Sequence, residues 1–182
     1  MVSFIVPAYN EELELPGTLE AIEHADLITV GPGSLFTSLV PNLLVRDVSR
    51  AIAQSRAVKV FVCNLMTQAN ESLGLSASDH IRALYKHARH QFFDYALVNR
   101  TPASPELARK YAEKGQSQIG PDVEGIESLG VRPVLGEYLL EENHPTEGLV
   151  ARHDTYRLAR DLLRLMAEVR EPELPALRRA GE

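Results

Sequence analysis

The stretch from Asp26 to Leu44 constrains the fold more than any other part of this 182-residue chain. It begins with an apolar run, Leu27 to Val30, which is typical of a short buried strand. The run ends at Gly31-Pro32-Gly33, and apolar sequence compatible with a helix follows. Three hydroxyl residues lie between the turn and the helical sequence: Ser34, Thr37 and Ser38. Glycine lets a backbone approach a phosphate closely, and the first N–H groups of a helix can bind an anion. The stretch therefore predicts an anion-binding loop, although Gly-Pro-Gly-Ser also occurs in ordinary turns.

The composition predicts one globular domain, because 45% of the residues are hydrophobic and 24% are charged. A net charge of -6 argues against nucleic acid as a partner, since phosphate backbones bind basic surfaces. The single cysteine, Cys63, fits a reducing compartment, and its apolar neighbours predict that it is buried. No run of roughly 18 apolar residues occurs, so we expect no membrane span. These features together predict a cytoplasmic protein.

Alternating strand and helix patterns predict an α/β fold with a mainly parallel sheet. Apolar runs indicate strands at Val2–Val6, Leu27–Val30, Val58–Cys63, Phe93–Val98 and within Val131–Leu140. Helical periodicity and capping residues indicate helices over 18–24, with Thr18 as its cap, and over 43–55, 76–89, 104–114, 123–129 and 154–169. Strands separated by helices form βαβ units, which require parallel pairing.

Polar side chains follow two of these strands where each strand ends. Gly31 to Ser38 follow the strand at Leu27–Val30, and Asn64, Thr67 and Gln68 follow the strand at Val58–Cys63. Ligands of open α/β sheets bind outside the carboxyl ends of the strands. Both groups are therefore predicted to lie beside a ligand.

The histidines and hydroxyls give little support for catalysis or for a metal site. His80, His87 and His90 lie on one predicted helix, but no cysteine or carboxylate set completes a metal site, so we expect exposed histidines. Asp79 could pair with His80 as acid and base, yet its spacing from Ser76 is better explained by helix capping. No Gly-x-Ser-x-Gly pattern occurs, so we predict no catalytic residue and no metal.

The first residues resemble a different family from the rest of the chain. The strand at Val2–Val6 with Pro7-Ala-Tyr-Asn-Glu-Glu12 resembles the opening of family-2 glycosyltransferases. In that family the positions of Pro7, Tyr9 and Glu11 lie near the nucleoside. The likeness does not continue beyond about residue 20, and the chain contains no Asp-x-Asp metal motif. We therefore expect a strand and loop without transferase chemistry, and a glycosyltransferase fragment is the alternative.

From about Leu19 onward, the chain resembles the C-terminal half of the gluconeogenesis factor family, relatives of the CofD phospholactate transferases. The motifs that carry the resemblance are Ala25 to Ser38, Pro41 to Val45, Val62 to Gln68, Ser76 to His80 and Lys110 to Ala112. Their order over so much of the chain makes chance similarity implausible.

The resemblance implies a partial Rossmann-like, three-layer sandwich that binds a nucleotide-sugar such as UDP-N-acetylglucosamine, or an NAD-type dinucleotide. Bacterial members are cytoplasmic regulators of cell-wall precursor supply, cell shape and growth on gluconeogenic carbon, and no catalytic activity is firmly attached to them. The CofD relatives transfer a phospholactyl group. By resemblance, the residues near the phosphates would be Gly31, Gly33, Ser34, Thr37 and Ser38. Further ligand contacts would come from Asn42, Asn64, Thr67 and Gln68.

Members of the family begin with a Gly-Gly-Gly-Thr-Gly phosphate loop and a long nucleotide-binding half, which this sequence lacks. We therefore expect a chimera or truncated product with a glycosyltransferase-like leader over 1–20, a CofD-like domain over 21–170 and a flexible tail over 171–182. Such a domain would expose a strand edge and bind its ligand more weakly. It could also require a homo-oligomer or a regulatory protein partner.

Overall fold

The computed structural model describes residues 2–4 and 15–170. Its centre is a five-stranded parallel sheet in which the strands lie side by side in the order of the sequence. The strands are β1 (Val2–Phe4), β2 (Leu27–Val30), β3 (Val58–Val62), β4 (Tyr95–Asn99) and β5 (Arg132–Gly136). Among the described residues, β1 pairs with β2 alone. The predicted α/β class with a parallel sheet is confirmed.

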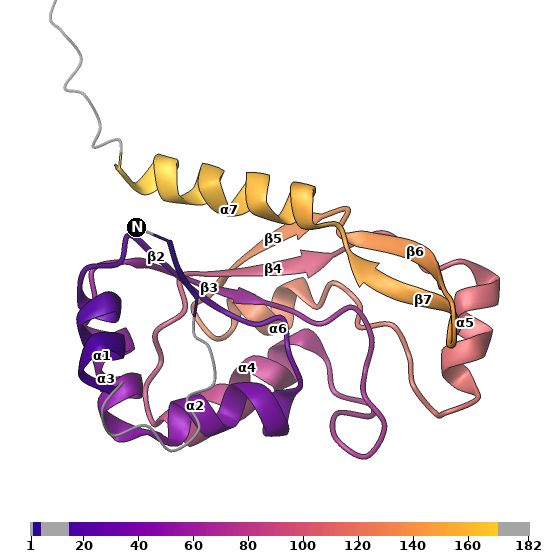
Figure 1. Ribbon diagram of the computed structural model, residues 1–182, viewed down its shortest axis with the longest axis horizontal. Helices are drawn as coiled ribbons and strands as arrows, with labels where there is room; N and C mark the ends of the chain where they lie inside the picture. Colours follow the sequence, from indigo (N-terminus) through magenta and orange to yellow (C-terminus); the bar gives the residue numbers. More distant parts are fainter. Residues whose placement is uncertain (1, 5–14, 171–182) are drawn as a thin grey trace, which may run out of the picture.

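The helices form a layer on each face of this sheet (Figure 1). One layer contains α1 (Leu15–Glu23), α2 (Val40–Leu44), α3 (Arg46–Gln54), α4 (Ala77–Ala88) and α6 (Val123–Glu127). Right-handed crossovers that always add the next strand on the same side place their helices on one face. The opposite face is covered by α7 (Thr155–Arg170), which completes a three-layer sandwich.

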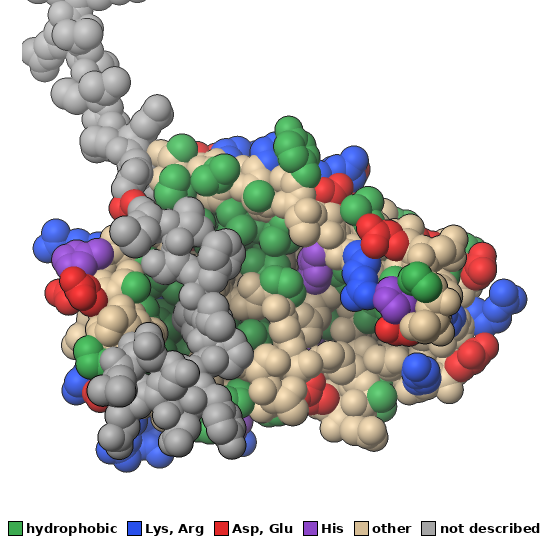
Figure 2. All heavy atoms as spheres, in the orientation of Figure 1, with side chains coloured by type: hydrophobic (Ala, Val, Ile, Leu, Met, Phe, Trp, Pro, Cys, Tyr) green, Lys and Arg blue, Asp and Glu red, His purple; other side chains and the backbone are tan. Residues whose placement is uncertain are grey.

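Alternate residues of the central strands fill two separate hydrophobic cores. Ile28, Phe61 and Ala96 are buried beneath the layer of α1 to α4. Their neighbours Val60 and Leu97 are buried on the other face, together with Leu162 and Leu165 of α7. Burial on both faces explains why these strands are continuous apolar runs rather than alternating ones. Figure 2 shows further hydrophobic side chains gathered on the surface just below α7.

A hairpin and a short helix lie beyond the carboxyl ends of the strands. The hairpin consists of β6 (Leu139–His144) and β7 (Gly148–His153), which pair antiparallel, and α5 (Pro105–Ala112) lies next to it. In the late strand region predicted over Val131–Leu140, with interruptions at Pro133 and Gly136, a strand does end at Gly136. Pro133, however, lies inside β5, and β6 continues beyond the predicted region to His144. The sequence pattern missed β7, since Gly148–His153 mixes small, apolar and basic residues without a continuous apolar run.

The predicted helices lie where the structure has helices, but several of their ends differ. The first begins at Leu15 rather than Thr18, because Pro16 is well suited to a first turn. The helix predicted over 43–55 is divided at Val45, whose extended backbone separates α2 from α3. A π-helical turn, η1 (Leu35–Leu39), precedes α2. The caps predicted at Ser76 and Ser104 are confirmed, since Ser76 and Asp79 form a reciprocal capping box and the Ser104 hydroxyl accepts from Leu107 N. The cap predicted at Thr18 is wrong, because Thr18 lies inside α1.

The histidine prediction is wrong for His80, which is only 1% exposed. Its Nδ1 lies 2.8 Å from the carbonyl oxygen of Ser76, and α4 packs against α2 and α6 while its apolar residues belong to the core beneath the sheet. A helix that contacts two neighbours buries a wider stripe than its apolar residues alone predict. His87 is half-buried with its ring 6.2 Å from that of Phe36, and His90 is exposed.

Pro7, Tyr9 and Glu11, which carry the glycosyltransferase resemblance, lie outside the described residues, as does the 171–182 tail. The division at residue 20 thus stays a prediction. Within the described ranges, no helix is both long enough and apolar enough to cross a bilayer.

Candidate functional site

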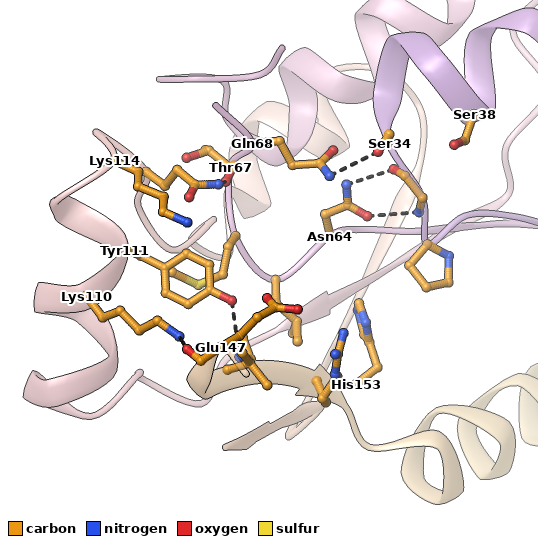
Figure 3. Close-up of a pocket in the computed structure, with 18 residues that line it drawn as sticks. Ser34, Ser38, Asn64, Thr67, Gln68, Lys110, Tyr111, Lys114, Glu147 and His153 are labelled. Carbon is orange, nitrogen blue, oxygen red and sulfur yellow. Dashed lines mark hydrogen bonds between the residues drawn. The ribbon is translucent and has the colours of Figure 1, made fainter. Parts of the chain in front are cut away.

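A cavity of about 640 Å³ opens at the carboxyl end of the sheet (Figure 3). The loops that follow β2 and β3 form one wall, and α5, the turn after it and β7 form the other. We call this space the main cavity. Its position agrees with the rule that α/β sheets bind ligands beyond the carboxyl ends of their strands.

The wall made by the two loops is held together by side-chain amides. Gly33 N donates to Asn64 Oδ1 at 3.0 Å, and Asn64 Nδ2 donates back to Gly33 O at 2.8 Å. Gln68 Nε2 donates to Ser34 Oγ at 3.0 Å. These bonds join residues more than thirty positions apart and place the hydroxyl of Ser34 on the cavity wall.

Gly31 allows the loop after β2 to pass close to the end of β3. Its φ is +89°, and a Cβ atom there would lie 2.5 Å from the carbonyl oxygen of Val62. A side chain at this position would therefore meet both a left-handed backbone and a main-chain atom that cannot rotate away. Glycine is therefore required at position 31 of the predicted turn, because any side chain there would clash with β3.

Thr67 links the loop after β3 to the segment after α5. Its main-chain N–H donates to Ser117 O at 2.8 Å, and its hydroxyl oxygen accepts from Ser117 N at 2.9 Å. Gln116 Nε2 donates to the carbonyl oxygen of Thr67 at 2.7 Å. The residue is almost fully buried but still lines the main cavity.

The opposite wall carries the positive charge of the site. Lys110 projects from α5, Lys114 from the turn after α5, and Arg152 from β7. No ion pair or hydrogen bond joins the side chains of Lys114 and Arg152 to other described residues. Among the residues that the structure describes, one acidic side chain lines this cavity, that of Glu147. The main cavity therefore places cations opposite neutral hydroxyl and amide groups, which suits an anionic ligand rich in hydrogen-bonding groups.

His153 lies between the two walls, and its Nε2 is 3.2 Å from the carbonyl oxygen of Cys63. A carbonyl oxygen can only accept, so Nε2 carries the hydrogen and Nδ1 keeps its lone pair. Burial lowers the pKa of His153, although the hydrogen bond to Cys63 opposes that shift. A neutral imidazole is consequently favoured at this position.

Lowering the pH should destabilise the protein through His153. Because its pKa in the folded state lies below that of the unfolded chain, the unfolded chain binds more protons in the window between the two values. This contribution to stability is complete above the unfolded value of about 6.5 and is lost as the pH falls below it. Urea unfolding of the His153→Gln variant should show a weaker decline in unfolding free energy between about pH 7.5 and 5.5 than the parent. Equal declines in the two proteins would contradict this.

The structure brings most of the predicted residues together. Those that line the main cavity are Gly33, Ser34, Ser38, Asn64, Thr67 and Gln68. A neighbouring hollow of about 380 Å³, the side cavity, lies between the loop after β2 and α7. The predicted residues that line it are Gly31, Gly33, Ser38 and Asn42. Their contact with a ligand stays a prediction.

Thr37 lines neither cavity, and the N–H groups expected to bind phosphate there already have a partner. The carboxylate of Glu71 accepts from Phe36 N at 3.1 Å and from Thr37 N at 2.9 Å. The first N–H groups of the turn after Ser34 thus bond to a protein carboxylate and are not available to a ligand. The Ser34 hydroxyl and the cations of the far wall are the groups directed toward the cavity.

Four residues of the site were missed by the sequence analysis: Lys110, Lys114, Arg152 and His153. Lys110 belongs to a motif that the resemblance had singled out, but a lysine on an exposed helix carries no signal of its own. Arg152 and His153 lie on β7, which was not predicted, so nothing placed them near the other loops.

Cys63 behaves as a small core residue, as its apolar neighbours predict. Burial, with a smaller contribution from the charge of Asp122, raises the pKa of its thiol to about 12. The thiol is therefore protonated and shielded at neutral pH. Across residues 2–4 and 15–170, no three histidine, cysteine or acidic side chains lie close enough together to hold a metal ion.

Comparison with known proteins shows which family the chain belongs to. A family model described as 2-phospho-L-lactate transferase CofD matches residues 3–139. The gluconeogenesis factor of Bacillus subtilis is 38% identical over 154 residues, which make up 85% of this chain and 47% of that protein. The gluconeogenesis factor of Listeria monocytogenes is 36% identical over 151 residues, covering 83% of this chain and 44% of that one.

A crystal structure of a protein from Bacillus halodurans has the same fold. Its TM-score is 0.75 at 39% identity, over 81% of this chain and 46% of that chain. The chain thus spans less than half the length of each of these relatives. Because the family model covers most of the chain and several gluconeogenesis factors resemble it throughout that region, the chain belongs to the CofD family, among its gluconeogenesis-factor-like members.

Proposed function

We propose that the main cavity binds the diphosphate and sugar of a nucleotide-sugar, of the UDP-N-acetylglucosamine type. The observation that carries the proposal is the pair of facing walls, with cations on one side and hydroxyl and amide groups on the other. A diphosphate has several charged oxygens that lysine and arginine bind strongly, and a sugar has hydroxyls that pair with serine and amide side chains. The cavity volume of about 640 Å³ lies in the ordinary range for a ligand of this size.

The charges on the far wall support an anionic ligand in particular. Lys114 and Arg152 have no acidic partner among the described residues, although the whole chain carries a net charge of -6. Unpaired cations that gather in a cavity of an acidic protein lower the energy of a bound anion. An NAD-type dinucleotide also contains a diphosphate, so it is the ligand against which a nucleotide-sugar must be compared.

The biological role that we propose is regulatory rather than catalytic. A protein that binds a cell-wall precursor can report the supply of that precursor, and so link it with cell shape and carbon metabolism. Relatives of this chain are named gluconeogenesis factors, which supports a link with carbon metabolism. Such a role would require either a second copy of the chain or another protein that recognises the bound state.

Isothermal titration with UDP-N-acetylglucosamine is expected to show binding that Arg152→Met weakens by about tenfold or more, since a hydrogen bond to a charged group contributes about 1.5–3 kcal/mol. NAD, titrated in parallel, is expected to bind more weakly. Lys86→Met is the matched control, because it removes an exposed cation from α4 that lines neither the main cavity nor the side cavity. A folded protein that binds neither ligand would overturn the proposal, and equal losses in both variants would show that only net charge matters.

A second candidate function is a transferase of CofD type, which the match of residues 3–139 to the CofD family model favours. It would be supported by transfer of a phospholactyl group to an alcohol from a nucleotide-activated donor, in which the phosphoanhydride bond breaks and a nucleoside monophosphate is released, with both products detected by mass spectrometry. Sugar transfer that Glu11→Ala abolishes would instead favour the glycosyltransferase alternative.

A further inference from the structure

The backbone N–H and C=O groups along β7 form hydrogen bonds with β6 on one side and with side chains of α5 on the other. Alternate residues of a strand direct their N–H and C=O groups away from the neighbouring strand. Lys110 Nζ donates to the carbonyl oxygens of Glu147 and Leu149, and Ala151 N donates to Tyr111 Oη at 3.2 Å. Two adjacent side chains of α5 therefore occupy the place that a third strand would take.

These bonds hold the turn end of the hairpin beside the cationic wall. The stretch from Val150 to His153 lines the main cavity, and it includes Arg152 and His153. Other polar links of the hairpin lie farther from its turn. Ser104 N and Oγ donate to the Glu141 carboxylate at 2.7 and 2.6 Å, Leu139 N donates to Asn99 Oδ1 at 3.0 Å, and His153 Nε2 lies 3.2 Å from Cys63 O. Lys110 is the link closest to the turn of the hairpin, and the turn would otherwise be free to move away from α5.

The ammonium of Lys110 has capacity for one more partner. A lysine ammonium carries three N–H donors, and the two carbonyl oxygens use two of them. Lys110 also lines the main cavity, and Figure 3 shows its side chain extending from α5 toward the Glu147 end of the hairpin. An anionic oxygen bound in the cavity would accept the third hydrogen bond from Lys110.

We propose that Lys110 is a positioning residue that ties the turn end of the β6–β7 hairpin to α5 and thereby, together with the bond between His153 and Cys63 O, holds Arg152 in place against the loops after β2 and β3. A bound anion takes the third donor of Lys110, so ligand binding makes the hairpin more rigid. This second part rests on the proposed function, because it requires an anionic ligand in the main cavity. The tether itself belongs to the free protein.

Hydrogen–deuterium exchange, followed by mass spectrometry on peptides covering residues 145–153, tests the tether without any ligand. Lys110→Met is expected to raise the exchange rate of these amides about tenfold, because the backbone loses two charge-assisted bonds. Lys114→Met is the matched control, since Lys114 lines the same cavity four residues later but bonds to no hairpin carbonyl. Lys110→Arg, which keeps a cation with several donors, should restore slow exchange. Equal exchange in the Lys110→Met and parent proteins would overturn the tether.

Titration with UDP-N-acetylglucosamine tests the ligand part. Both lysine variants should bind about tenfold more weakly, but ligand should slow hairpin exchange in the parent and in Lys114→Met and not in Lys110→Met. Affinity unchanged in Lys110→Met, despite a mobile hairpin, would overturn the positioning role. A parent protein that binds no anion would overturn the ligand part together with the proposed function, while the exchange comparison would still decide the tether. Thermal unfolding curves of each variant exclude global unfolding as the cause of faster exchange.

Discussion

Replacing Gly31 with alanine is expected to lower the free energy of unfolding by about 3 kcal/mol or more, as measured by urea denaturation. The residue has a φ of +89°, and the new Cβ would lie 2.5 Å from the main-chain oxygen of Val62. A left-handed backbone costs a non-glycine residue about 1–2 kcal/mol, and overpacking against rigid atoms about 1–3 kcal/mol more. Because the loop after β2 would have to move away from β3, binding at the main cavity should be lost as well.

Gly33→Ala is the control for this substitution. Its backbone is not left-handed, and the nearest atom to its new Cβ would be Cδ2 of Leu39 at 3.1 Å, the end of a flexible side chain. A small adjustment of that side chain should limit the loss to about 1 kcal/mol. If the two alanine variants were equally stable, the steric account of the loop would be wrong.

Asn99→Ala should cost about 3 kcal/mol in unfolding free energy and should also loosen the hairpin. The side chain is 3% exposed, and its Oδ1 accepts from Tyr138 N at 2.9 Å and from Leu139 N at 3.0 Å. Its Nδ2 donates to Thr101 O at 2.8 Å. Alanine would leave two buried N–H groups without a partner, and each such group costs about 1–3 kcal/mol. Urea denaturation gives the stability, and exchange of the 139–153 amides reports the hairpin.

Asn143→Ala provides the comparison for this residue, because Asn143 is an exposed asparagine on β6. Exposed substitutions of this kind usually change stability by less than about 0.5 kcal/mol. A loss for Asn99→Ala that was no larger than the loss for Asn143→Ala would show that the hydrogen bonds of Asn99 do not hold the end of β4 to the hairpin.

The parts of the fold that the sequence predicted are those governed by local chemistry. Continuous apolar runs such as Val58–Val62 identify strands buried on both faces, and Ser76 with Asp79 identifies the start of α4. The polar residues after β2 and β3 were placed at one site because parallel strands end at the same edge. The proposed ligand class came from the resemblance to a family, because the spacing of apolar residues carries no information about a ligand.

The parts that could not be predicted depend on contacts between distant segments. His80 is buried because α2 packs against α4, and no pattern within α4 reveals that neighbour. Glu71 binds the N–H groups of Phe36 and Thr37 across more than thirty residues, so a predicted anion site has a protein carboxylate in it. Arg152 lines the main cavity from β7, which lies beside α5 across about forty residues of sequence, and a basic residue in a polar strand gives no such indication.

The order of strands in the sheet has a consequence for how the chain is made. Strands β1 to β5 lie in the order in which the ribosome releases them, so each βαβ unit can dock on the one before it. The sheet face bearing Val60 and Leu97, in contrast, is covered by Leu162 and Leu165 of α7. Translation at about 5–20 residues per second leaves that apolar face bare for seconds after β5 has emerged. During synthesis, this face of the nascent sheet is therefore the apolar surface that is open to aggregation or to a chaperone.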